Sequence, residues 1–203
     1  MSFFSKTKKE RAAFTEVDAE FSELLVSKLE KATFAGGFFW CMEGPFEAIA
    51  GVENAIVGFA GGTVVAPTYQ EVVSGKTGHR EAVQVFFDPQ QVSYTTLVET
   101  FWWQIDPTDP GGQFADRGSD YTTAIFYHNS EQKKAAEKQR ADLEKSGRYQ
   151  KPMVTEILPF TTFYPAEDYH QQFYQKRVAY YQMYKKGSGR EDYIEAMQKK
   201  YGT

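Results

Sequence analysis

The alternation of apolar and polar positions divides the chain into short elements that are separated by glycine- and proline-rich breaks. Small and apolar residues at 32–35 predict a strand that passes through Gly36 and Gly37 into a helix beginning near Phe38 or Phe39. Apolar residues at spacings of three and four extend this helix to Ala50, while Pro45 predicts a kink or break near its first turn. This strand-to-helix turn is the most distinctive feature of the chain.

The remaining pattern predicts further strands and capped helices in alternation. Strands are expected at 52–58, 81–87, 122–128 and 154–160. Helices are expected at 94–104, capped by Ser93, and at 130–145, capped by Asn129 or Ser130. Long loops are expected at 62–80 and 106–120, and the tail beyond residue 165 is expected to be helical in pieces with a break at 187–189.

This order of elements indicates an α+β fold. Residues 32–128 match a ferredoxin-like split βαβ core, to which long loops and a wrapping C-terminal segment are added. We expect a single domain over residues 31–203, preceded by an amphipathic helical arm over residues 1–30. We expect this domain to be a monomer.

Composition limits the classes of function that fit the chain. The 203 residues are 41% hydrophobic and 25% charged, with a net charge of −4, which is typical of a soluble globular protein and does not favour nucleic-acid binding. No apolar run approaches the length of a membrane span, and the basic N-terminus lacks the apolar stretch of a secretory signal. The single cysteine excludes an intramolecular disulfide and fits a reducing compartment, so we expect a cytoplasmic protein without membrane contacts.

Common cofactor motifs are missing from the sequence. There is no glycine-rich nucleotide-binding motif and no paired-cysteine or metalloprotease motif. The three histidines, His79, His128 and His170, lack the spacing of metal ligands. We therefore expect neither a bound metal nor a bound cofactor.

Three features could carry chemistry. Glu81 follows a glycine-rich turn at the start of an apolar strand; this segment alone favours an exposed carboxylate, whereas an apolar pocket would raise its pKa and make it a proton donor. Tyr69 and Tyr121 lie in or beside the two long loops, where they could brace the loops or hold a substrate oxygen. A lone helical cysteine such as Cys41 is more often a small buried apolar residue than a nucleophile.

Taken together, the motifs resemble the peptide methionine sulfoxide reductase family of the A type, over roughly residues 32–174. The resemblance rests on Gly-Gly-x-Phe-Trp ending at Trp40 with Glu43 beyond it, Gly58-Phe-Ala-Gly-Gly62, Pro67-Thr-Tyr69, Gly75-x-Thr-Gly-His-x-Glu-Ala-Val83, Asp106-Pro107, Asp116-x-Gly-x-x-Tyr121 and Phe163-Tyr-Pro-Ala-Glu-Asp-Tyr-His-Gln171. It implies thiol-dependent reduction of the S epimer of methionine sulfoxide in proteins and in free methionine, which repairs oxidised proteins. It also implies recycling by thioredoxin or a small thiol.

The resemblance implies a role for each matching residue. The family's nucleophilic cysteine corresponds to Phe38. Glu81, Tyr69 and Tyr121 correspond to the groups that hold and protonate the sulfoxide oxygen, with Asp116 nearby. Phe39 and Trp40 correspond to the rings that enclose the substrate methyl group.

Phe38 is the main departure from the family pattern, because a phenylalanine has no ionisable group. A smaller departure is Asp120-Tyr-Thr122, where Gln-Tyr-Arg is usual. Three hypotheses follow. The chain is a reductase scaffold that is inactive or impaired because its nucleophile is replaced, or a non-catalytic binder of oxidised methionine peptides, or an enzyme in which Cys41 is the working thiol.

Overall fold

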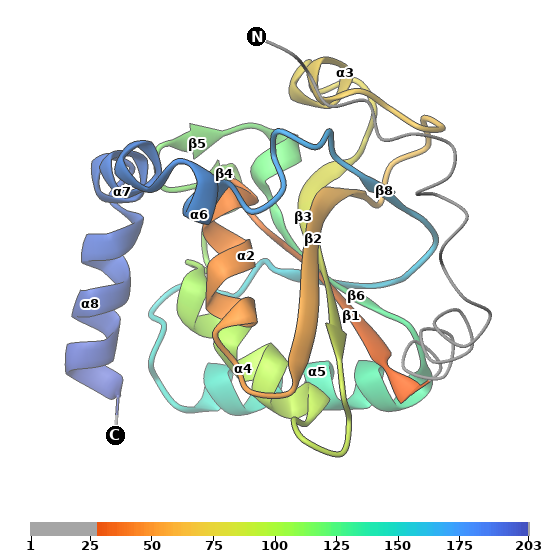
Figure 1. The fold of residues 1–203 in the computed structure, drawn as a ribbon. Helices are drawn as coiled ribbons and strands as arrows, with labels where there is room; N and C mark the ends of the chain where they lie inside the picture. Colours follow the sequence, from red (N-terminus) through yellow and green to blue (C-terminus); the bar gives the residue numbers. More distant parts are fainter. Residues whose placement is uncertain (1–27, 203) are drawn as a thin grey trace, which may run out of the picture.

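The computed structural model describes residues 28–202, which fold around a six-stranded sheet (Figure 1). From one edge to the other, its strands are β7 (Glu156–Pro159), β6 (Thr123–Tyr127), β1 (Glu30–Gly36), β3 (Arg80–Phe87), β2 (Val52–Ala60) and β8 (Phe163–Pro165). The predicted arm over 1–30 falls almost wholly outside the described residues. The division into an arm and a domain over 31–203, like the monomeric state, stays a prediction.

The helices connect these strands and form the C-terminal end of the described chain. They are α2 (Trp40–Glu47), α3 (Tyr69–Val73), α4 (Tyr94–Gln104), α5 (Ser130–Lys145), α6 (Phe173–Lys176), α7 (Val178–Gly187) and α8 (Arg190–Tyr201). A two-stranded hairpin, β4 (Gly112–Gln113) and β5 (Asp116–Arg117), and the 3-10 helix η1 (Ser119–Tyr121) lie between α4 and β6. Among residues 28–202, no helix combines the length and apolar character needed to cross a membrane.

The four central strands confirm the predicted ferredoxin-like core. Strands β6, β1, β3 and β2 are neighbours in that order, and every pairing among them is antiparallel. Helix α2 connects β1 to β2, and α4 follows β3, which gives the split βαβ order. Strand β7 extends this core in parallel to β6, and β8 extends it antiparallel to β2.

The hydrophobic core lies on the face of the sheet that α2, α4 and α5 cover. The Phe34 ring of β1 stacks on Phe46 of α2 and on Phe101 of α4, with both centroid distances at 5.1 Å. Burying one such ring stabilises the fold by about 2 kcal/mol. The opposite face carries small residues, chiefly Ala35, Ala60, Ala82 and Ala124.

The predicted helix caps are confirmed for the two longest helices of the core. The Ser93 hydroxyl accepts a hydrogen bond from the Thr96 N–H at 3.1 Å, and the Asn129 side chain accepts one from the Gln132 N–H at 2.8 Å. The first helix is shorter than predicted, because α2 continues past Pro45 but ends at Glu47. After Glu47 the chain forms successive turns up to Gly51, which adopts a φ of 93°.

Both predicted loops contain regular structure. In the first, Thr68 and Glu71 form a reciprocal capping box at the start of α3. In the second, the β4–β5 hairpin and η1 replace the expected irregular chain. The fourth predicted strand is shorter than expected, since β7 begins only at Glu156, and the sequence reading missed β8. The pieces of the tail and the break before Arg190 agree with the prediction.

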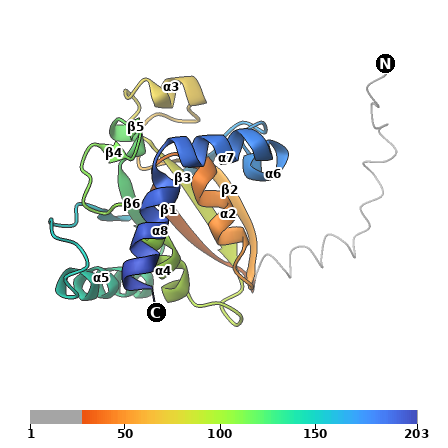
Figure 2. The ribbon, with the colours of Figure 1, turned by 90° about the vertical axis from the view of Figure 1, so that its left-hand side faces the viewer.

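The elements that carry the candidate residues meet at one end of the sheet. In Figure 1, α3, the β4–β5 hairpin, α6 and α7 gather around the point where β1 ends and α2 begins. Figure 2 shows α7 crossing above this point and α8 lying against α4, which it contacts.

Candidate active site

The turn between β1 and α2 carries Phe38 and Phe39 into the interior. The Cys41 N–H donates to the Phe38 carbonyl at 3.1 Å, and the Met42 N–H donates to the Phe39 carbonyl at 3.0 Å, which closes the first turn of the helix. The Phe38 side chain is 7% exposed and Phe39 is fully buried. Position 38 is therefore a nearly closed site at a helix start.

Glu81 lies beside this turn because of its place in β3. It belongs to the same row of alternating residues as Val83, Val85 and Phe87, which face the helices and the core. The expectation of an exposed strand-end carboxylate is wrong, since the Glu81 side chain is 0% exposed. Alternation along β3 is the signal that could have revealed its burial.

The surroundings of Glu81 favour its protonated form. Its Oε2 accepts a hydrogen bond from the Phe39 N–H at 2.9 Å, while its Oε1 has no partner among the described residues. Burial raises the pKa of Glu81 well above its usual value; the Phe39 N–H opposes this, and the Asp120 and Asp116 carboxylates add to it. A buried, neutral carboxylic acid can donate a proton near neutral pH.

Tyr69 and Tyr121 lie close enough to Glu81 for its charge to act on both hydroxyls, and we call these three residues the Glu81 pocket. The capping box at Thr68 fixes the start of α3, and the Tyr69 N–H donates to Oε1 of Glu167 at 3.1 Å. Burial, and then the Glu81 charge, raises the pKa of Tyr69 to about 12 and raises the pKa of Tyr121 further. Both hydroxyls therefore stay protonated at neutral pH and can donate hydrogen bonds.

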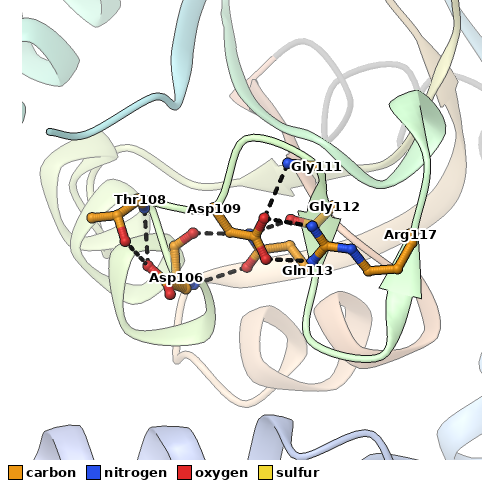
Figure 3. Close-up of polar contacts among 7 residues, drawn as sticks. All are labelled: Asp106, Thr108, Asp109, Gly111, Gly112, Gln113 and Arg117. Atoms are coloured by element: carbon orange, nitrogen blue, oxygen red, sulfur yellow. Dashed lines mark hydrogen bonds and ion pairs between the residues drawn. The ribbon is translucent and has the colours of Figure 1, made fainter. Parts of the chain in front are cut away.

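A network of polar contacts surrounds the β4–β5 hairpin (Figure 3). Asp116 is the first residue of β5 in this hairpin. The Arg117 guanidinium binds both carboxylate oxygens of Asp109, and the Asp109 Oδ1 also accepts from the Gly111 N–H at 3.0 Å. The buried Gln113 side chain accepts from the Asp106 N–H and donates to the Asp106 carbonyl, both at 2.8 Å. These bonds link the hairpin to the loop before it, and Asp116 pairs with Gln113 across the two strands.

Asp116 is bound by a tyrosine from the C-terminal segment. The Tyr184 hydroxyl of α7 contacts both carboxylate oxygens of Asp116 and lies 2.5 Å from Oδ1. Burial raises the pKa of Asp116, and the Tyr184 hydroxyl partly offsets this. The same tyrosine packs its ring on Phe38, with the centroids 4.7 Å apart.

Aromatic rings enclose position 38. The Phe38 ring contacts Trp40 at a centroid distance of 4.6 Å and Tyr121 at 6.3 Å. Trp40 stacks on Phe173 at 3.4 Å, and its indole N–H lies 3.1 Å from Nδ1 of His170. The Phe38 side chain thus fills a ring-lined space directly beside the Glu81 pocket.

The structure brings every sequence-predicted candidate into this neighbourhood and adds residues that the sequence reading gave no role. His170 is buried between Tyr69 and Trp40, although the sequence suggested only its place in a motif. Asp120 is buried next to Glu81, and Tyr184 reaches the site from α7. No local signal could identify Tyr184, because only the folding back of the C-terminal segment brings it to Asp116.

Cys41 has the properties of a buried apolar residue. Its side chain is 0% exposed, and burial raises the pKa of its thiol, although the Arg190 charge opposes this. The structure therefore favours packing over nucleophilic chemistry for Cys41.

Because of this burial, we expect the native Cys41 thiol to react with an aromatic disulfide reagent roughly a hundredfold more slowly than the same thiol in the unfolded chain. The release of the coloured thiol, followed before and after addition of concentrated urea, measures both rates. A rapid reaction of the native protein, with the midpoint of its pH dependence below the usual thiol pKa, would instead support Cys41 as a working nucleophile.

Comparisons with known proteins identify the family of the chain. The family model described as peptide methionine sulfoxide reductase matches residues 30–201. Peptide methionine sulfoxide reductase MsrA of Listeria monocytogenes is 58% identical over 168 residues, which cover 83% of this chain and 95% of the relative.

Solved structures show the same fold. Methionine sulfoxide reductase A of Corynebacterium diphtheriae has a TM-score of 0.67 and 34% identity, covering 74% of this chain and 76% of that one. Mxr1 from Saccharomyces cerevisiae in its reduced form has a TM-score of 0.70 and 27% identity, covering 75% of this chain and 87% of that one. The chain belongs to the peptide methionine sulfoxide reductase family.

Proposed function

We propose that this site is built to reduce the S epimer of methionine sulfoxide in proteins and in free methionine, and that Phe38 leaves this chain inactive or impaired in the reaction. The observation that carries the proposal is the Glu81 pocket, a buried acid flanked by two neutral tyrosine hydroxyls. Such a set of donors suits an oxygen that gains negative charge as its bond to sulfur breaks. The test is thiol-driven reduction of an S-sulfoxide peptide by this chain beside its Phe38→Cys variant.

With a cysteine at position 38, each site residue has a role in the proposed reaction. The thiolate attacks the sulfoxide sulfur while Glu81 gives a proton to the oxygen, and Tyr69 and Tyr121 hold that oxygen. The attack forms a bond between the cysteine sulfur and the substrate sulfur, and the protonated oxygen leaves as water. Water then attacks the cysteine sulfur, the sulfur–sulfur bond breaks to free the methionine thioether, and the cysteine, oxidised by two electrons, becomes a sulfenic acid. Asp116 stands beside the reacting sulfur, and Phe39 and Trp40 enclose the substrate methyl group.

The reductant in this proposal is an external thiol. The chain contains one cysteine, which is buried, so a sulfenic acid at position 38 would form its disulfide with thioredoxin or a small thiol. Mxr1 from Saccharomyces cerevisiae has been solved in complex with Trx2, and the Mxr1 chain of that structure resembles this chain in its fold. The single cysteine also leads us to propose a reducing compartment, the cytoplasm.

A second candidate function is binding of oxidised methionine without reduction. It is favoured by the retention of the oxygen-binding groups around a position that lacks a thiol. Glu81 Oε1 is buried and has no hydrogen-bond partner within residues 28–202, and a ligand oxygen would satisfy it. The Phe38 ring works against this function, because it fills the space that the substrate sulfur would need.

Calorimetry separates the two candidates. For an impaired reductase, we expect no measurable heat when an S-sulfoxide peptide is titrated into this chain, and measurable binding to the Phe38→Ala variant, in which the ring is removed. Tight binding by the unaltered chain, with clear preference for the S-sulfoxide over both the unoxidised peptide and the R epimer, would favour the binder instead.

A further inference from the structure

Arg190 is a buried cation that forms no ion pair with a carboxylate among the described residues. It begins α8, its side chain is 1% exposed, and no ion pair involves it in residues 28–202. Burying a guanidinium without an acidic partner is costly unless its donors are all bound. A cation at the first position of a helix also opposes the helix dipole. Helix stability therefore does not account for an arginine at this position.

The guanidinium binds backbone groups at the end of β1 and at the end of α4. Nη2 donates to the Gly36 carbonyl at 2.9 Å, and Nη1 donates to the Gln104 carbonyl at 2.7 Å. Nη1 also lies 3.6 Å from the Met42 sulfur in α2, and the guanidinium stacks over the Phe114 ring at 4.8 Å. One side chain thus joins α8 to β1, α2, α4 and the β4–β5 hairpin.

The backbone at position 37 is shaped around this guanidinium. Gly37 has a φ of 79°, and a side chain there would lie 2.8 Å from Arg190 Nη2 and 2.6 Å from the Gln113 side chain. Only glycine leaves room for the arginine behind the turn. Gly37 directly precedes position 38, so the contact fixes the residue that the proposed reaction uses.

We propose that Arg190 is a positioning residue, which fixes the β1–α2 turn and places a positive charge behind position 38. This inference rests on the proposed function, because it gives Arg190 the task of orienting and stabilising a thiolate at that position. A cation near a thiol favours its ionised form.

The charge of Arg190 matters because the other groups around position 38 are mostly acidic or neutral. The Asp116 carboxylate of β5 and the Asp120 carboxylate of η1 disfavour a thiolate there, and Glu81 of β3 does so once it ionises. The neutral groups around position 38 are the side chains of Tyr69, Tyr121, Tyr184 and His170 and the thiol of Cys41 in α2. Lys185 of α7 is a second cation near the site among the residues that the structure describes. It is partly exposed, and its Nζ lies 3.8 Å from Oε1 of Glu191. Arg190 also lowers the pKa of the Asp116 carboxyl and of the Cys41 thiol.

The experiment measures the thiol pKa at position 38 in a chain that carries Phe38→Cys and Cys41→Ala, so that the introduced thiol is the only one. Alkylation rates with iodoacetamide are followed from pH 4 to pH 10 for this parent and with Arg190→Met, Arg190→Gln or Arg190→Lys added. Circular dichroism and thermal unfolding report the fold of each variant. The matched control is Arg140→Met, since Arg140 also donates to two backbone carbonyls, those of Met153 and Thr155, but away from the site.

We expect Arg190→Met and Arg190→Gln to raise the pKa of the introduced thiol by about one, which slows alkylation near neutral pH roughly tenfold. Arg190→Lys should keep most of the effect of the charge, and Arg140→Met should lower the unfolding temperature without moving the thiol pKa. If Arg190→Met does not fold, Arg190→Gln carries the comparison.

An unchanged thiol pKa in a folded Arg190→Met or Arg190→Gln variant would overturn the inference. An equal rise with Arg190→Lys would overturn the role of the charge. These readouts need no substrate, so they remain valid even if the Phe38→Cys chain fails to reduce methionine sulfoxide, an outcome that would count against the proposed function alone.

Discussion

The Phe38→Cys variant is expected to reduce a methionine-(S)-sulfoxide peptide with dithiothreitol at least roughly a thousandfold faster than the unaltered chain. The substitution supplies a nucleophile at a helix start, where the dipole and the Arg190 charge favour a thiolate. It also removes a ring that contacts Trp40, Tyr121 and Tyr184, and so opens the space beside the Glu81 pocket. The reduced peptide, separated from the sulfoxide peptide by chromatography after fixed times, measures the rate.

Phe38→Ala is the matched control for this gain, because it opens the same space without a thiol. It should remain as inactive as the unaltered chain, and so should a Phe38→Cys chain that is alkylated before the assay. Addition of Cys41→Ala should leave the gained activity intact, since the Cys41 side chain is fully buried and its thiol stays protonated. A folded Phe38→Cys chain that binds the sulfoxide peptide but forms no reduced peptide would contradict the proposed function.

The parts of the fold that the sequence predicts are those specified by local patterns. Short stretches of consecutive residues specify each of these parts. They are the alternation of β3, the capped helices α4 and α5, and the glycine-rich turn after β1. The βαβ order of these elements then limits the sheet to few arrangements. Because these signals agree, the ferredoxin-like core could be predicted from the sequence.

The remaining features depend on contacts between distant segments. The glycines and prolines of these segments led to a prediction of irregular loops where α3 and the β4–β5 hairpin lie. The capping box of Thr68 and Glu71 is a local signal from which α3 could have been predicted. Strand β8 exists because it pairs with the edge of β2, and three residues are too few to show a pattern of their own. Similarly, Tyr184 and Arg190 reach the site only through the fold of the C-terminal segment.

Replacing the acid of the Glu81 pocket is expected to have the second-largest effect. In the Phe38→Cys background, Glu81→Gln should lower the rate of sulfoxide reduction by about 10²–10⁴-fold, because glutamine fits the site but cannot give a proton to the oxygen. Tyr69 and Tyr121 would still hold the oxygen, so some activity should remain. Single-turnover measurements without added reductant isolate this step from recycling.

The pH dependence gives this prediction a definite sign. Burial raises the pKa of Glu81, so the acid is protonated and competent below that raised pKa, and activity should fall as pH rises through it. On the acidic side, activity should rise with pH as the introduced thiol ionises. Glu81→Gln should abolish the alkaline fall and leave the acidic rise in place, because only the thiol would then titrate.

Glu43→Gln is the matched control for a buried acid outside the Glu81 pocket. Burial raises the pKa of Glu43 to about 7, and its Oε1 accepts from the Gln172 N–H at 2.8 Å, so its carboxyl anchors the segment before α6. Its replacement should change the unfolding temperature while keeping the alkaline fall in activity. If Glu81→Gln keeps that fall too, or keeps the full rate, the proton reaches the oxygen from another group, and the tyrosine hydroxyls of the pocket become the first candidates.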